Sequence, residues 1–162
     1  MISSNFQIYP FHTYIESGLR ALLSLYEAYP TGMSFERLHY YDYISVHTAD
    51  FEGPQSLHAS FPHRSGEYLV RRELVEQGLE YMRVKGLISV SLSPRGIEYI
   101  LTDNAGDYIL SLNKPYIDKL KIRIKWVHYT FSDTSTEKLR DVFSKKLGKW
   151  DNLLEFQSIG KA

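Results

Sequence analysis

The sequence predicts a mainly α-helical protein with one small β-hairpin, in the order of a winged helix-turn-helix followed by C-terminal helices. Three observations lead to this fold class. Apolar residues recur at helical spacing in three segments before Gly86, residues 87–102 alternate with period two around a turn, and a helical seam follows Pro115. The chain of 162 residues is long enough for one compact domain with an extension. We place a winged-helix domain at residues 1–113 and a helical extension packed on it at residues 114–162.

Two helices are expected first. Residues 13–29 carry large apolar side chains at helical spacing, and Pro30 ends the segment. Ser34 is a typical N-cap residue, because its hydroxyl oxygen can accept a hydrogen bond from a free backbone N–H. A second helix is therefore expected at residues 35–46. The irregular stretch at residues 47–64 is long for a loop inside a compact domain, and such loops tend to be functional or disordered.

A third helix is expected from about Ser65, with Gly86 at its C-terminal stop. The run LISVSLS then alternates with period two, and SPRG has the composition of a turn. Residues 87–102 are therefore expected to form a hairpin. Asp103 or Asn104 is expected to cap a further helix.

The segment after Pro115 is expected to be helical, because its apolar residues step by three and four. The letters LKIRIKWV also alternate, so a strand is the second interpretation. A polar break follows this segment. Thr134 or Ser135 is expected to cap a last helix that runs to about Leu147, before Gly148.

Composition excludes several classes of protein. The chain has no cysteine, which excludes disulfides, thiolate zinc sites and iron–sulfur clusters and is typical of a reducing compartment. The N-terminus has no secretory signal and no apolar run is long enough to span a bilayer, so we expect a cytoplasmic protein without membrane contact. Residues 1–113 hold 8 basic and 13 acidic residues, whereas residues 114–149 hold 10 basic and 4 acidic ones. The basic part is expected to be a solvated helical face, or a surface for a polyanion or a partner.

The irregular stretch contains side chains of the kinds that bind metals or take part in catalysis. His47, Asp50, His58 and His63 lie close together in the sequence, and such side chains suit zinc or iron. Their spacing matches no metal-binding motif, so we favour hydrogen-bonded loop histidines and expect no metal and no cofactor. No nucleophile elbow, phosphate-binding loop or dinucleotide fingerprint is present, so we expect no enzymatic activity.

Nucleic-acid binding has several candidate residues. Arg71 and Arg72 lie near the start of the expected third helix, and Arg95 lies at the expected hairpin tip. Lys121 and Lys125 lie on the helix expected after Pro115. These five residues are the candidates for DNA contact. Glutamates on the third helix would repel phosphate. We therefore favour ion pairs of Arg71 and Arg72 with Glu67, Glu76 or Asp50.

The second helix carries more aromatic residues than one buried face needs. Tyr40, Tyr41 and Tyr43 cannot all point the same way, because adjacent positions on a helix diverge by about 100°. Two interpretations remain open here. Either a partner covers some of these rings, or the chain buries them itself with the irregular stretch and the C-terminal helices.

One long motif resembles a known family. The segment YYDYISVHTADFEGPQSLHASFPHRSGEYLVRRELVEQGLEYMRVKGLI is similar to the middle component of bacterial three-component ABC systems, whose pattern is DY…VH(S/T)xD…GPxSLHPxxPxRxGE. The matching residues include His47, Asp50, His58, Arg64 and Glu67, and Ala59 departs from the proline of the pattern. The opening NFQIYPFHTYIESGLRAL and the late KWDNLLEF also resemble the ends of that family.

The resemblance implies a non-catalytic winged-helix subunit. Such subunits accompany an SMC-like ABC ATPase and an effector, often a nuclease, as in Lamassu-type anti-phage defence, and they help to couple DNA sensing to the effector. The implied partners are thus the ATPase, the effector and double-stranded DNA reached through the complex. The motif residues are expected to serve the fold and an interface: His47, Asp50, His58, His63, Arg64 and Glu67. Within this set, Arg64 is expected to hold the loop through Glu67 or Asp50. The alternative is a winged-helix transcription regulator that binds DNA by itself.

Overall fold

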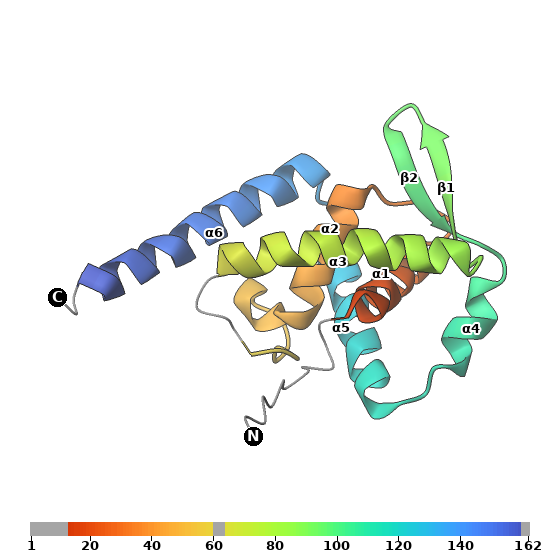
Figure 1. Cartoon of the computed structure of the whole chain (residues 1–162), viewed down its shortest axis with the longest axis horizontal. Coiled ribbons are helices and arrows are strands. Elements are labelled where there is room, and N and C mark those ends of the chain that lie inside the picture. The colour runs from red at the N-terminus through yellow and green to blue at the C-terminus, as the bar shows by residue number, and fades with distance from the viewer. Residues whose placement is uncertain (1–12, 60–63, 160–162) are drawn as a thin grey trace, which may run out of the picture.

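A computed structural model describes residues 13–59 and 64–159 of the chain, with the side chains of residues 150–159 left out of the description. It is mainly helical with one two-stranded antiparallel hairpin and C-terminal helices, which confirms the expected fold class (Figure 1). Three helices followed by a hairpin are consistent with a winged helix. The elements are α1 (Tyr14–Ala28), α2 (Phe35–Val46), the 3-10 helix η1 (Thr48–Phe51), α3 (Arg64–Val84), β1 (Ile88–Ser93), β2 (Gly96–Leu101), α4 (Ala105–Ser111), α5 (Pro115–Phe131) and α6 (Thr136–Ile159).

Local signals set most helix ends. The Thr13 hydroxyl accepts a hydrogen bond from the Glu16 N–H at the start of α1, and the Ser34 hydroxyl does the same for the Arg37 N–H at the start of α2. Gly86 follows α3 with a φ of 77°, a left-handed conformation that glycine adopts without a Cβ penalty. The bounds expected for α1, α2 and α3 are therefore confirmed to within a residue or two.

The core is continuous from α1 to α6. Helix α1 packs against both α3 and α5, and α3 lies across α1 and α2 in Figure 1. Residues from both expected parts of the chain meet in one buried cluster that includes Leu22, Leu25, Leu38, Ile44, Val75, Leu79, Met82, Ile124, Val127, Leu139 and Phe143. Burial of this apolar surface is the main driving force for the packing of α5 and α6 on the first three helices.

Two glycines allow α1 and α3 to cross at close range. A Cβ on Gly18 would lie 2.7 Å from the Gly78 carbonyl oxygen, and a Cβ on Gly78 would lie 2.4 Å from the Gly18 backbone nitrogen. Both distances are far shorter than a van der Waals contact. The crossing of α1 and α3 therefore requires glycine at both positions.

The hairpin is anchored at one end and projects from the helices at the other (Figure 1). Strands β1 and β2 pair from Ile88↔Leu101 at the base to Ser93↔Gly96 at the tip. Met33 and Tyr99 exchange backbone hydrogen bonds of 2.9 and 2.8 Å, which join the segment before α2 to β2. Toward the tip, Leu92 is 84% exposed.

Residues 115–131 form helix α5, which confirms the helix expected after Pro115 and excludes the strand interpretation of LKIRIKWV. Two details at the ends of other helices differ from expectation. Gly148 does not end the last helix, because α6 continues through it to Ile159. Asn104 lies at the N-cap position of α4 but its side chain makes no capping hydrogen bond. Among the described residues, no helix combines the length and apolarity needed to cross a bilayer.

The helix crossing leads to a first prediction. Gly78→Ala should lower the free energy of unfolding by about 1–3 kcal/mol, because the added methyl group overlaps the α1 backbone, which cannot move without disturbing the core. Urea unfolding followed by circular dichroism measures this change. Gly148→Ala is the matched control, since it meets open space in a helix and should be neutral or stabilising by about 0.5–1 kcal/mol. Equal effects of the two substitutions would contradict the prediction.

Candidate functional site

The motif loop, defined here as residues 47–59, is stabilised by its own hydrogen bonds. It follows α2 directly and begins with η1. The Thr48 hydroxyl donates to the Pro54 carbonyl oxygen at 2.7 Å, and the Ala49 N–H donates to the Ser56 hydroxyl at 3.1 Å. The backbone N–H of His58 returns to the carbonyl oxygen of Val46, also at 3.1 Å. These hydrogen bonds hold the loop against the end of α2, so contacts within the chain define its path.

Helix α5 covers one side of the motif loop. The Trp126 ring lies against Gly53, where an added Cβ would come within 2.5 Å of the indole. Arg123 Nε donates to the Gln55 carbonyl oxygen at 2.8 Å. Glycine is therefore required at position 53 because the tryptophan ring occupies the space of a side chain.

Helix α3 is joined to the motif loop by two polar contacts. His47 Nε2 donates to Glu67 Oε1 at 2.7 Å, and both side chains are buried. Arg64 Nη1 donates to Asp50 Oδ2 at 2.6 Å, with the two side chains only 18% and 19% exposed. Both contacts link the loop to the first turn of α3. Of the two partners expected for Arg64, Glu67 and Asp50, the structure thus shows the contact with Asp50.

Beneath these contacts lies a buried ionic cluster of three helices. Asp42 of α2 accepts from Arg20 Nε of α1 at 2.6 Å through one carboxylate oxygen, and from Arg71 Nε of α3 at 2.9 Å through the other. All three side chains are at most 3% exposed. Burial alone would raise the pKa of Asp42, but the two guanidinium groups outweigh it and hold this pKa below its ordinary value. The carboxylate therefore stays charged and connects α1, α2 and α3.

Sequence reasoning missed Arg20 and Asp42. Arg20 stands within the buried stripe of α1, where Ser17 and Ser24 accompany it one turn to either side. The Arg20 Nη2 donates to the Ser17 hydroxyl at 3.0 Å. An arginine flanked by serines on an otherwise apolar face was the available signal. A buried arginine requires a carboxylate partner, and Asp42 occupies the buried face of the next helix.

The aromatic residues of α2 are buried by the chain itself. Tyr40, Tyr41 and Tyr43 are all at most 4% exposed. Tyr40 and Tyr43 pack against Tyr68 of α3 and Phe143 of α6, with ring centroids between 4.6 and 6.1 Å apart. Of the two interpretations of the tyrosine-rich helix, burial within the chain is therefore correct. The rings are not available to a partner.

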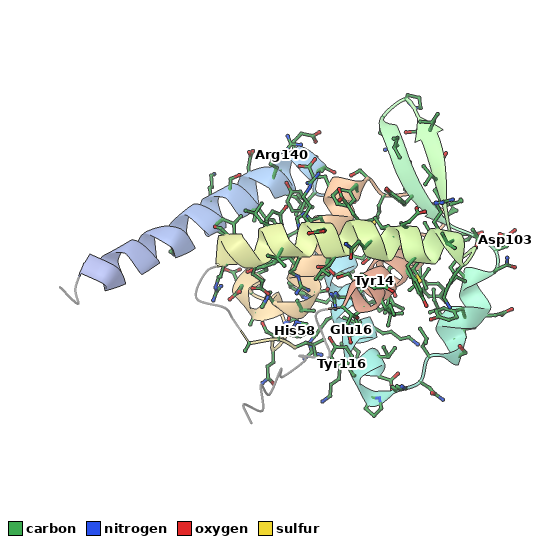
Figure 2. All side chains as sticks on the ribbon, viewed as in Figure 1. Tyr14, Glu16, His58, Asp103, Tyr116 and Arg140 are labelled. Carbon is green, nitrogen blue, oxygen red and sulfur yellow. The ribbon has the colours of Figure 1, made fainter. Side chains whose placement is uncertain are left out.

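Helix α6 is held on α2 by polar contacts at its first turns. Arg140 donates to both carboxylate oxygens of Glu36 at 2.7 and 2.8 Å, and the Tyr40 hydroxyl donates to the same carboxylate at 2.8 Å. Figure 2 shows Arg140 on this part of α6. Farther along, Lys146 Nζ donates to the Asp50 carbonyl oxygen at 3.0 Å. Helix α6 thus contacts both α2 and the motif loop.

Of the two remaining histidines of the motif, the structure describes His58. His58 Nε2 forms a 3.0 Å hydrogen bond with the Tyr116 hydroxyl at the start of α5, and both residues are labelled near each other in Figure 2. His63 lies outside the described residues. Within the part of the chain that the structure describes, no group of three or more histidine, aspartate or glutamate residues is arranged to hold a metal ion.

The DNA-contact candidates lie on three separate elements. Arg71 is buried on α3 and bonded to Asp42, so its burial argues against contact with DNA. Arg72 is exposed and places its guanidinium 4.9 Å from the centre of the Phe35 ring. Within the hairpin, Arg95 is 77% exposed and lies 3.4 Å from Glu98.

On α5, the two lysine candidates differ in their surroundings. Lys121 Nζ donates to the Ile109 and Leu112 carbonyl oxygens at the end of α4, at 3.2 and 2.9 Å. Lys125 is exposed. Lys121 is therefore bound to carbonyl oxygens at the C-terminal end of α4, and Lys125 remains available at the surface.

The buried ionic cluster leads to a second prediction. Asp42→Asn should cost about 3–5 kcal/mol of unfolding free energy, because it removes the charged partner of the buried Arg20 and leaves Arg71 only the more distant Glu67 carboxylate at 3.7 Å. Equilibrium urea unfolding measures the loss. The exposed Arg83–Glu80 pair supplies the control, and Glu80→Gln should cause no measurable change. A loss of stability no larger than that of Glu80→Gln would show that Asp42 does not stabilise the packing of the three helices.

A third prediction concerns the Arg64–Asp50 contact. A double-mutant cycle with Arg64→Ala, Asp50→Ala and the double variant should give a coupling free energy of about 0.5–3 kcal/mol, because both side chains are largely withdrawn from water. Thermal and urea unfolding of the four proteins provide the values. Additive effects would mean that the contact does not stabilise the loop on α3.

Comparison with known proteins agrees with the motif. A family model described as ABC-three component (ABC-3C) system Middle Component 2 matches residues 10–152. No curated protein and no solved structure matches the chain. The matched range includes the motif loop, the buried ionic cluster and the first turns of α6, and it confirms the resemblance at the level of a middle component. The chain therefore belongs to the Middle Component 2 family of ABC-three component systems.

Proposed function

We propose that the protein is a non-catalytic accessory subunit that connects an SMC-like ABC ATPase to an effector in an anti-phage system of the Lamassu type. The observation that carries the proposal is the family match over residues 10–152, since a middle component of a multi-component system has protein partners. In this proposal the subunit acts in the cytoplasm and helps the complex to sense double-stranded DNA.

The chemistry of the motif supports an assembly role in preference to an active site. His47, Glu67, Asp50 and Arg64 contact one another as matched donors and acceptors within the chain. A general acid or base must reach a substrate proton, which the buried His47 and Glu67 side chains do not do in this arrangement. These two contacts hold the motif loop on α3, and Trp126, Arg123 and Lys146 hold it on α5 and α6. A subunit that joins two partners requires such a rigid framework.

The remaining cations support DNA contact only as part of a complex. Arg72, Arg95 and Lys125 stay at the surface, on α3, the hairpin and α5. Glu73 and Glu76 are also exposed on α3, next to Arg72 in sequence or one turn away. Acidic residues at these positions weaken attraction to phosphate. We therefore assign specific DNA binding to the assembled complex and not to this chain alone.

Co-purification tests this proposal as the fourth prediction. The tagged chain is co-expressed with the ATPase and the effector encoded beside its gene. Both should elute with it in one complex on size exclusion, because the subunit connects them. The Arg64→Ala variant should recover less complex, whereas Glu80→Gln should recover the same amount, since only the first substitution loosens the motif loop.

Two results would contradict the proposal. The chain could elute alone while the other two proteins are soluble and folded. It could also bind a specific DNA duplex with nanomolar affinity by itself at physiological salt, which would indicate a transcription regulator instead.

A further inference from the structure

An apolar groove lies between α1, α4 and α5, away from the motif loop contacts. Its volume is about 260 Å³, and we call it the α1–α5 groove. The buried Leu23, Ile109 and Ile124 contribute to its lining. Three large side chains of the same lining are exposed: Tyr26 at 42%, Leu110 at 71% and Ile122 at 63%. The groove is thus a gap in the surface that apolar residues line on several helices.

Large exposed apolar side chains rarely gather around one groove on the surface of a monomeric protein. Single exposed apolar side chains need no explanation, but a contiguous set around a concave site is typical of an interaction surface. Tyr129 of α5 is 87% exposed and follows Ile122 by seven residues, which is two helical turns on the same face. Ile122 and Tyr129 are thus two exposed apolar side chains about 10 Å apart along one face of α5.

Residues of two adjacent helices line the groove. Leu23 and Glu27 lie one turn apart on α1, Ile122 and Lys125 lie one turn apart on α5, and α1 packs directly on α5. A helical occupant of the groove could therefore contact a turn of each helix.

The charge at the rim is mainly positive. Lys121 and Lys125 line the groove, and Glu27 is the one acidic residue among its described lining residues. Lys125 is exposed, and no ion pair involving it is found among the described residues. An occupant with carboxylates beside its apolar face would pair with this lysine. The apolar centre at Ile122 and Leu110 is unsuited to a phosphate backbone.

We propose that the α1–α5 groove binds an amphipathic helix of a partner subunit, with apolar anchors at positions i, i+3 or i+4 and i+7 and with acidic residues along the flank that faces Lys125. Helix-in-groove recognition uses this spacing of anchors. The proposal rests on the proposed function, because it assigns a surface to the contact with one partner of the complex. It uses residues that the motif loop and its contacts with α3 do not.

Site-specific crosslinking tests the groove, and the absence of cysteine makes single-cysteine variants of the full chain direct to prepare. Ile122→Cys is labelled with a benzophenone maleimide in the co-expressed complex with the ATPase and the effector. We expect a crosslink to one of these two subunits. Peptide mapping should place it in a helical segment with the predicted apolar and acidic residues. Leu92→Cys, at the exposed end of the hairpin, is the matched control and should not crosslink to that segment.

Affinity provides the second measurement of this fifth prediction. Ile122→Asp should weaken binding of the crosslinked subunit by about tenfold or more, as expected for an anchor residue. Lys125→Glu should also weaken binding of this subunit, and the loss of affinity should grow as the salt concentration is lowered, because the substitution replaces attraction to acidic residues by repulsion. The melting temperature of each variant should match that of the wild type, because both positions are exposed.

The possible results separate this inference from the proposed function. A complex that assembles but crosslinks only from Leu92→Cys overturns the groove and leaves the proposed function intact. Unchanged affinity of Ile122→Asp, or crosslinks between two copies of this chain or within one copy, does the same. If no complex forms with wild-type protein, the proposed function fails and the inference fails with it.

Discussion

The position of α3 depends on the buried carboxylate of Asp42. Its two oxygens accept from Arg20 and Arg71, so one side chain connects α1, α2 and α3 where water is excluded. The desolvation of three charges is costly, and the pairing of both guanidinium groups with this carboxylate offsets that cost. Few other arrangements of the three helices would let this carboxylate accept hydrogen bonds from both arginines. The ion pairs therefore fix the orientation of α1 and α3, while Gly18 and Gly78 allow their close approach.

The motif loop depends on that arrangement in turn. Once α3 is placed, Arg64 and Glu67 in its first turn meet Asp50 and His47 of the loop. The loop then presents Gly53 to the Trp126 ring, and α6 reaches the loop through a lysine. Residues that read in the sequence as a possible metal or catalytic cluster are therefore connected, pair by pair, to different elements of the fold. This distribution favours a role in assembly, while the α1–α5 groove leaves a separate surface for a partner.

Sequence reasoning performed best where the signal was local. Ser34 and the apolar spacing after it located α2, and the alternation around SPRG located the hairpin, because caps, turns and periodicity act over a few residues. It failed at Gly148, since a single glycine costs a helix only about 1 kcal/mol and favourable neighbours can offset that. At Asn104 a good capping residue was present without its hydrogen bond. The Arg64–Asp50 contact and the Arg71–Glu67 ion pair at 3.7 Å were anticipated, whereas the bond of Arg71 to Asp42 and that of His58 to Tyr116 were not.

The sequence by itself determined the fold class, the order of the elements and the family motif, because each of these is written in short-range patterns. Only the tertiary structure decided which side chains pair. Arg20 and Asp42 are 22 residues apart, and Asp42 and Arg71 are 29 apart, on three helices whose relative positions no local pattern specifies. The tertiary structure also decided that the tyrosines of α2 are covered by α3, α5 and α6, and that Ile122 and Leu110 are not covered. Burial depends on what lies across the core, and periodicity within one helix does not contain that information.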